Sequence, residues 1–78
     1  MQSNIHQDAN LYIARLNEGE QAKHLLGAGR SAWMQVSRGT VDLNGTKLKA
    51  GDGAAVSKES ELRVDATKPS EVLLFDLA

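Results

Sequence analysis

The sequence predicts an all-β fold, an antiparallel β-sandwich closed in the manner of a jelly roll or a small barrel. Apolar residues recur with a period of two in short runs, which is the spacing of strands that bury one face. Glycine or polar clusters separate these runs. Helices receive little support, because the polar segment "NEGEQ" is short and interrupted by glycine. Eight short strands in 78 residues therefore predict one modest core.

Each expected strand is defined by its alternation and by the turn that ends it. "NLYIARL" and "AKHLL" flank the glycine-broken segment, and "AWMQVS" follows a second glycine cluster. "TVDLN" and "TKLKA" lie on either side of an Asn-Gly pair, "GAAVS" follows "AGDG", and "ELRVDAT" follows a polar loop. The last strand, "VLLFDL", is mostly apolar. The expected strands are residues 10–16, 22–26, 32–37, 40–44, 46–50, 53–57, 61–67 and 72–77.

Two turns are expected to direct these strands. The pair Asn44 and Gly45 predicts a two-residue hairpin, because that turn needs positive φ at both positions and Asn-Gly adopts it at least cost. In "AGDG", we expect Asp52 to bond a nearby backbone N–H while Gly51 or Gly53 takes the left-handed conformation. We expect these residues to serve the turns alone.

Alternation also predicts which side chains face inward. Ala32, Leu62 and Ala66 fall on the apolar side of their strands. Charged neighbours such as Asp42 and Arg63 fall on the other side, as a sheet with one solvated face requires. We therefore expect an apolar lumen, lined by Met34, Val36, Val41, Leu43 and Val64.

Two apolar features depart from this one-sided pattern. The final strand has apolar residues in succession from 72 to 75, so both of its faces need cover. Trp33 lies on the side of its strand opposite to Met34. Packing against a second sheet or the N-terminal segment would cover Trp33, and so would contact with another domain. The expected interface residues are Trp33, Leu73, Phe75 and Leu77.

Composition excludes several functional classes. Nine basic and ten acidic side chains, with no run of like charges, give no surface for following phosphates, so we expect no nucleic-acid partner. The absence of cysteine excludes disulfides, thiolate nucleophiles and zinc ribbons, and favours a reducing compartment. No apolar stretch approaches the ~20 residues of a membrane helix, and the N-terminus lacks a secretion signal. We therefore expect a soluble, cytoplasmic protein with no membrane partner.

Four segments carry a resemblance to a known family. "AWMQVS" followed by "RGTVDLNGTKLKAGDGAAV" resembles the cupin barrel. With "IHQDANLYIARLNEGE", "KAGDGAAVS" and "EVLLFDL", the chain resembles the C-terminal cupin domain of pirin-like proteins of the bacterial quercetin dioxygenase type. The likeness implies one cupin-like domain across residues 1–78, with its core at about 5–77. It also implies a two-cupin protein whose N-terminal half holds the metal.

Cupins bind their metal through two sequence motifs, and of these motifs the chain keeps the turn glycines. Gly19 and Gly39 match the two ends of the first motif, and Gly51 matches the start of the second. At none of the resulting ligand positions does this chain have a histidine or glutamate, so we expect no cofactor and no catalytic residue. The positions of the metal ligands fall at Leu25, Gly27, Ala32 and Leu62.

The chain's two histidines do not change this expectation. A catalytic transition metal needs at least three convergent donors. His24 lies one residue from an expected ligand position, and an offset of one turns a strand side chain to the other face. We expect His24 on the surface, and His6 in a mobile, polar N-terminal segment.

Three functions remain open at this point. The first is a metal-free, non-catalytic module that packs on a catalytic N-terminal cupin or associates with a second copy. The second, implied by the resemblance, is the accessory half of a metal-dependent quercetin 2,3-dioxygenase. The third is a small-molecule binder using the lumen around Met34, Val36 and Leu62, although we expect side chains to fill a lumen of this size.

Overall fold

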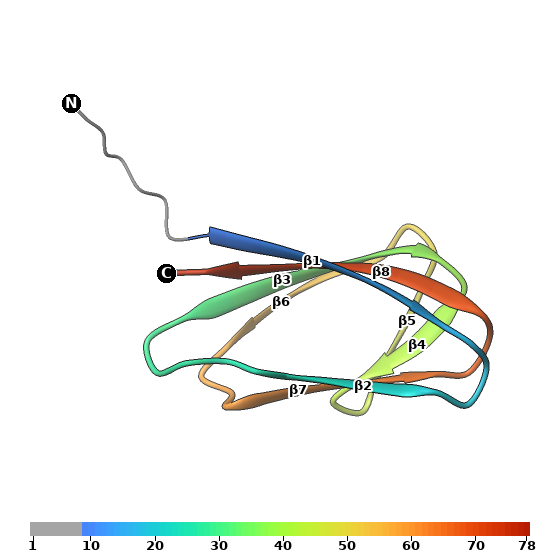
Figure 1. Cartoon of the computed structure of the whole chain (residues 1–78), viewed down its shortest axis with the longest axis horizontal. Helices are drawn as coiled ribbons and strands as arrows, with labels where there is room; N and C mark the ends of the chain where they lie inside the picture. Colours follow the sequence, from blue (N-terminus) through green and yellow to red (C-terminus); the bar gives the residue numbers. More distant parts are fainter. Residues whose placement is uncertain (1–8) are drawn as a thin grey trace.

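A computed structural model describes residues 9–78, which form two four-stranded antiparallel sheets packed face to face (Figure 1). The first sheet has the order β1-β8-β3-β6 and the second sheet the order β2-β7-β4-β5. The all-β sandwich expected from the sequence is thereby confirmed. The strands are β1 (Ala9–Leu16), β2 (Gln21–Leu25), β3 (Ser31–Arg38), β4 (Thr40–Leu43), β5 (Thr46–Lys49), β6 (Gly53–Ser57), β7 (Glu61–Ala66) and β8 (Ser70–Leu77).

The strand ends agree with the expected ranges to within two residues. The largest difference is at the start of β8, which begins at Ser70 rather than at residue 72. Ser70 is buried, and its hydroxyl accepts a hydrogen bond from the Thr40 N–H (3.1 Å) and donates one to the Lys68 carbonyl (2.6 Å). These bonds hold the chain extended before the apolar run begins.

The chain crosses between the sheets at most of its connections. Among the described strands, only β4 and β5 pair with a neighbour in sequence, and β1 runs beside β8 from the opposite end of the chain (Figure 1). The β4–β5 hairpin has the register that the Asn-Gly pair predicts, with Leu43 opposite Thr46. Its two turn residues, Asn44 and Gly45, have φ of 48° and 92°.

The other turns use glycine and aspartate. Gly19, Gly39 and Gly51 have φ of 87°, 81° and 92°. Asp52 Oδ2 accepts a hydrogen bond from the Lys49 N–H at 3.0 Å, as expected for this turn. Gly39 is also crowded, since a Cβ there would overlap Ser70 Oγ and the Pro69 carbonyl.

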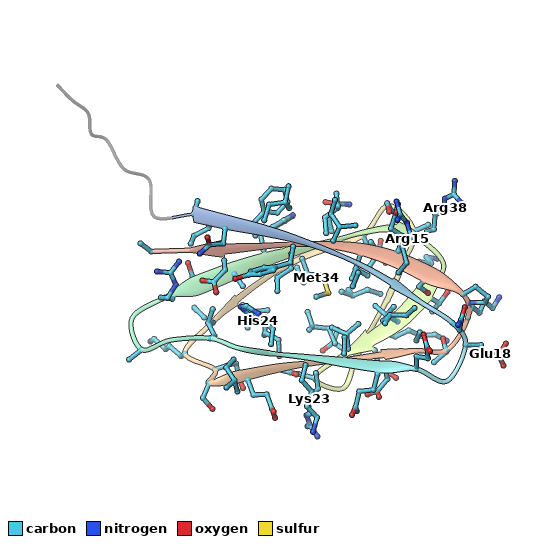
Figure 2. The ribbon with its side chains drawn as sticks, in the orientation of Figure 1. Arg15, Glu18, Lys23, His24, Met34 and Arg38 are labelled. Carbon is cyan, nitrogen blue, oxygen red and sulfur yellow. The ribbon has the colours of Figure 1, made fainter. Side chains whose placement is uncertain are left out.

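The core lies between the two sheets and contains the inward-facing residues of both. Met34, Val36, Val41 and Leu62 are almost fully buried, and the Met34 sulfur lies between the sheets (Figure 2). No helix within residues 9–78 is long and apolar enough to span a membrane. The core comprises Leu26, Ala32, Met34, Val36, Val41, Leu43, Leu48, Leu62, Val64, Ala66, Val72 and Leu74.

Candidate functional site

The outer side of the first sheet is apolar across three neighbouring strands. Directly opposed residues of antiparallel strands face the same way, so Phe75 lies between Leu11 on β1 and Trp33 on β3. Ile13 lies opposite Leu73 in the same manner. Leu11, Ile13 and Trp33 are 54%, 57% and 41% exposed. We call this surface the outer apolar face; it consists of Leu11, Ile13, Trp33, Leu73, Phe75 and Leu77.

Trp33 is held against the surface of the first sheet. Its Nε1–H donates to Gln35 Oε1 at 3.3 Å, and its ring covers Gly53 so closely that a Cβ there would overlap it. Trp33 faces away from the second sheet. Packing against that sheet, one of the two ways in which the chain itself was expected to cover Trp33, is therefore excluded. The other, the N-terminal segment, lies outside the described residues.

Charged side chains border the outer apolar face at one end of β8. Glu71 Oε2 accepts a hydrogen bond from Arg15 Nε at 2.9 Å, and Glu71 Oε1 accepts one from Ser37 Oγ at 2.8 Å. The Ser37 and Arg15 hydrogen bonds lower the pKa of the Glu71 carboxyl. Arg15 points outward from the sandwich (Figure 2). The apolar surface therefore ends at an ionised border.

The interior contains a cluster of polar residues that the sequence analysis did not identify. The Asp76 side chain is 8% exposed and accepts hydrogen bonds from Arg30 Nε (2.6 Å) and His24 Nε2 (2.7 Å). These bonds, with that from Arg30 the stronger influence, lower the pKa of the Asp76 carboxyl. The Tyr12 ring lies beside His24, with the ring centroids 4.8 Å apart. We call His24, Arg30 and Asp76 the inner polar cluster.

His24 lies inside the sandwich, so the expectation of a surface histidine is wrong (Figure 2). It opposes the fully buried Leu62 across the β2–β7 pair and shares its inward direction. Leu25, the next residue, is 76% exposed. The expectation was wrong because the cupin motif register placed Leu25 inward and therefore His24 outward. In the structure the pleat of β2 is shifted by one residue, so His24 faces inward and Leu25 outward.

The other expected ligand positions have different surroundings. Ala32 and Leu62 face inward and are buried, and Gly27 lies in the loop between β2 and β3. Across residues 9–78, no three His, Cys, Asp or Glu side chains come together as metal ligands would. His6 lies outside the described residues. Ala32 and Leu62 thus place hydrocarbon, and no metal-binding group, at these two inward positions.

A sequence signal for the inner polar cluster exists in retrospect. Strict alternation in β8 places Asp76 on the same side as Val72 and Leu74, which are buried. A lone aspartate at an inward position needs charged or hydrogen-bonding partners. The sequence does not identify Arg30 and His24 as those partners, because they are 46 and 52 residues away along the chain.

Comparisons with known proteins agree with this architecture. The chain matches the family model of the quercetinase C-terminal cupin domain over residues 2–77. It is 44% identical over 73 residues to a quercetin 2,3-dioxygenase of Escherichia coli K12, and 35% identical over 74 residues to a pirin-like protein of Caulobacter vibrioides. Each alignment covers at least 94% of this chain but only 32% of the relative.

The solved structures give the same result. The structure of the bacterial pirin YhhW from Escherichia coli in complex with nickel(II) superposes with a TM-score of 0.90 at 44% identity. That alignment covers 94% of this chain and 32% of the YhhW chain. The chain therefore spans about a third of the length of the relatives that it matches.

Proposed function

This chain belongs to the quercetinase C-terminal cupin domain family, and on that basis we propose that it is a metal-free, non-catalytic module that packs on a catalytic N-terminal cupin domain of the same protein. The observation that carries the proposal is the outer apolar face. Leu11 and Ile13 are each more than half exposed there, beside Trp33. Contiguous exposed apolar surface of this kind is typical of interaction sites.

The size of the relatives favours a domain of the same polypeptide as the partner. The matched relatives are about three times as long as the aligned segment, which leaves room for further domains. Contacts between domains of one chain bury about 600–1,500 Å² and have a polar rim. The Arg15 and Glu71 pair supplies such a rim beside the apolar strands. Homodimerisation through the same face is the competing arrangement.

The packing of the interior supports the metal-free part of the proposal. Leu26, Ala32 and Leu62 occupy the inward positions near His24, and none of them carries a donor atom for a metal. The Asp76 carboxylate is already shared by a guanidinium and an imidazole. A carboxylate that already accepts hydrogen bonds from His24 and from the Arg30 guanidinium attracts a further cation weakly, because the guanidinium charge repels that cation.

Binding to the N-terminal domain of the Escherichia coli relative tests the packing. The chain should bind that domain in calorimetry, and Ile13→Lys should weaken binding at least about tenfold by placing a charge in the interface. Leu25→Lys is the matched control, since Leu25 is an exposed leucine on the second sheet. Equal effects of the two variants would reject the outer apolar face. A concentration-dependent dimer in sedimentation, abolished by Ile13→Lys, would assign the face to a second copy instead.

Elemental analysis tests the absence of a metal site. After dialysis against iron, nickel, copper and manganese, the chain should retain no stoichiometric metal. His24→Ala should leave the small residual metal content unchanged, because His24 is already paired with Asp76. One tightly held metal ion per chain, lost in His24→Ala, would reject this part of the proposal.

A second candidate is the accessory half of a quercetin 2,3-dioxygenase. It is favoured by the 44% identity to a protein of that name. In this case the chain alone should consume no oxygen with quercetin, and adding it to the separated Escherichia coli N-terminal domain should raise that domain's rate. Oxygen uptake by the isolated chain would contradict both candidate functions.

We also infer a cytoplasmic location for this domain. Small domains in oxidising compartments are commonly stabilised by disulfides, and this chain has no cysteine. A fluorescent fusion found outside the cytoplasm would contradict the inference.

A further inference from the structure

A cavity of about 140 Å³ lies between the two sheets, on the side where β1 and β2 form the edges. Its lining comes mainly from the inner sides of these two strands and of their neighbours β8 and β7, and it includes Lys23 of β2, whose side chain is directed away from the sandwich. Within the described residues, β1 and β2 belong to different sheets and are not paired with each other, so the cavity lies along an unclosed edge. The aliphatic part of the lining is Ala14, Ala22, Leu62, Val64, Val72 and Leu74.

The cavity exists because two edge positions carry small residues. Ala14 and Ala22 are only half-buried, whereas Met34 and Val36 of β3 are almost fully buried. The space is therefore beside the core and not at its centre. A cavity of this size accommodates one aromatic ring, since an apolar cavity of about 150 Å³ binds benzene.

Two aromatic side chains add polar groups to the otherwise mainly aliphatic lining of the cavity. Tyr12 and His24 both contribute to the lining, with an angle of 52° between their rings. His24 Nε2 faces the Asp76 carboxylate at 2.7 Å, so in the neutral imidazole the proton resides on Nε2. Nδ1 then carries a lone pair, and among residues 9–78 it has no hydrogen-bond partner.

We propose that this cavity binds a single-ring aromatic molecule with one hydrogen-bond donor, such as a phenol, and that His24 Nδ1 accepts the donor's hydrogen bond. The aliphatic walls supply burial for the ring, and the Tyr12 ring offers a tilted aromatic contact. Arg30 and Asp76 orient the imidazole from the other side without touching the ligand. This binding site is independent of whether the outer apolar face meets another domain.

Titration of the ¹⁵N-labelled chain with phenol and with benzene tests the proposal. Phenol should produce saturable shifts of the amides of Ala22, His24 and Leu62, with a dissociation constant in about the millimolar range. Benzene should bind about three- to tenfold more weakly, because one hydrogen bond is lost. Shifts that do not saturate, or that fall on the outer apolar face alone, would overturn the proposal.

Three alanine variants locate the binding. Ala14→Leu and Ala22→Leu fill the cavity and should each lower phenol affinity at least about tenfold. Ala55→Leu adds the same atoms on the outside of the first sheet, opposite Trp33, and should leave phenol affinity unchanged. Unchanged affinity in both cavity variants would place phenol elsewhere and reject the site.

The requirement for a donor is tested at His24 itself. His24→Phe keeps a ring but removes Nδ1, so phenol and benzene should then bind equally. A phenol preference that survives in this variant would contradict the role of Nδ1. If His24→Phe does not fold, the phenol-to-benzene ratio of the unaltered chain decides the question, because a ratio near one excludes the hydrogen bond.

Discussion

The outer sides of the two sheets differ sharply although their inner sides are alike. The outer side of the first sheet is the apolar surface around Phe75, whereas on the second sheet Lys23 lies opposite Arg63 and Asp42 opposite Lys47. Figure 2 shows Lys23 directed away from the sandwich. Both sheets therefore bury one face, but only the second has the other face suited to water.

This difference shows that the inner and outer residues of the alternating strands have separate roles. The inner residues determine that the chain folds, because both sheets contribute buried aliphatic residues to a single core. The outer residues do not contribute to that core and so are free to differ. An apolar outer side on one sheet alone is what the proposed packing on another domain requires.

The largest change in the free energy of unfolding is expected when a leucine on the inner side of the second sheet is compared with one on the outer side. Leu62 is fully buried, and Leu62→Ala should lower the free energy of unfolding by about 2–5 kcal/mol through lost burial and a cavity. Leu25→Ala, on the exposed side, should change it by less than about 0.5 kcal/mol. Urea denaturation measures both, and similar losses would mean that the two sides of this sheet are not distinct.

The next largest change in stability is expected when the two carboxylates of β8 are compared. Asp76 lies on the inner side of the strand and Glu71 on the outer side. Asp76→Asn should lower stability at neutral pH by about 1–3 kcal/mol, because two charge-assisted hydrogen bonds are weakened. Glu71→Gln removes a more exposed ion pair with Arg15 and should have a smaller effect.

The same two carboxylates predict a pH dependence. Both have a lowered pKa in the folded state, so the unfolded chain binds their protons more tightly. Their stabilisation is present above the ordinary carboxyl pKa of about 4 and is lost as the pH falls through and below it. Denaturation between pH 2 and 7 should show a shallower acid loss in Asp76→Asn than in the unaltered chain. An unchanged slope would contradict the assigned role of the inner polar cluster.

A smaller effect is expected at the contact between Trp33 and Gly53. Gly53→Ala adds a Cβ that overlaps the indole ring, so the ring should move outward and its fluorescence should shift to the red. Gly45→Ala, in the hairpin of the second sheet, should reduce stability through its positive φ without altering the emission. Identical emission in all three proteins would show that Gly53 does not position the ring.

The smallest change in the free energy of unfolding is expected on the polar outer side of the second sheet. Lys23 and Arg63 are like charges directly opposite each other, and Lys23→Glu should raise the free energy of unfolding by about 0.2–1 kcal/mol. High salt should screen most of this gain. A gain that persists at 1 M salt would have a cause other than charge.

Much of the fold could be predicted from local pattern. The strand ranges and the register of the β4–β5 hairpin follow from alternation and from the positive φ that Asn44 and Gly45 adopt. The apolar character of β8 and the placement of Trp33 outside the core also follow from alternation. These features depend on residues within a few positions of each other, so the sequence carries them directly.

Other features could not be predicted in this way. Alternation alone does not indicate which side of β1 faces outward, because Leu11 and Ile13 alternate with Tyr12 and Ala14, and both sets contain apolar residues. Assignment of β1 to the edge of the first sheet, beside β8, determines the side. The motif register also misplaced His24, since a shift of one residue reverses a strand side chain.

By itself, the sequence determined that this chain forms short antiparallel strands with an aliphatic interior, because pleat and turn conformations are set by neighbouring residues. Only the tertiary structure decided that Asp76 meets His24 and Arg30, and that two alanines leave a ring-sized space at one edge. Both depend on the order of strands in the sheets. That order brings His24 and Asp76 together across 52 positions of the chain, and no local pattern encodes it.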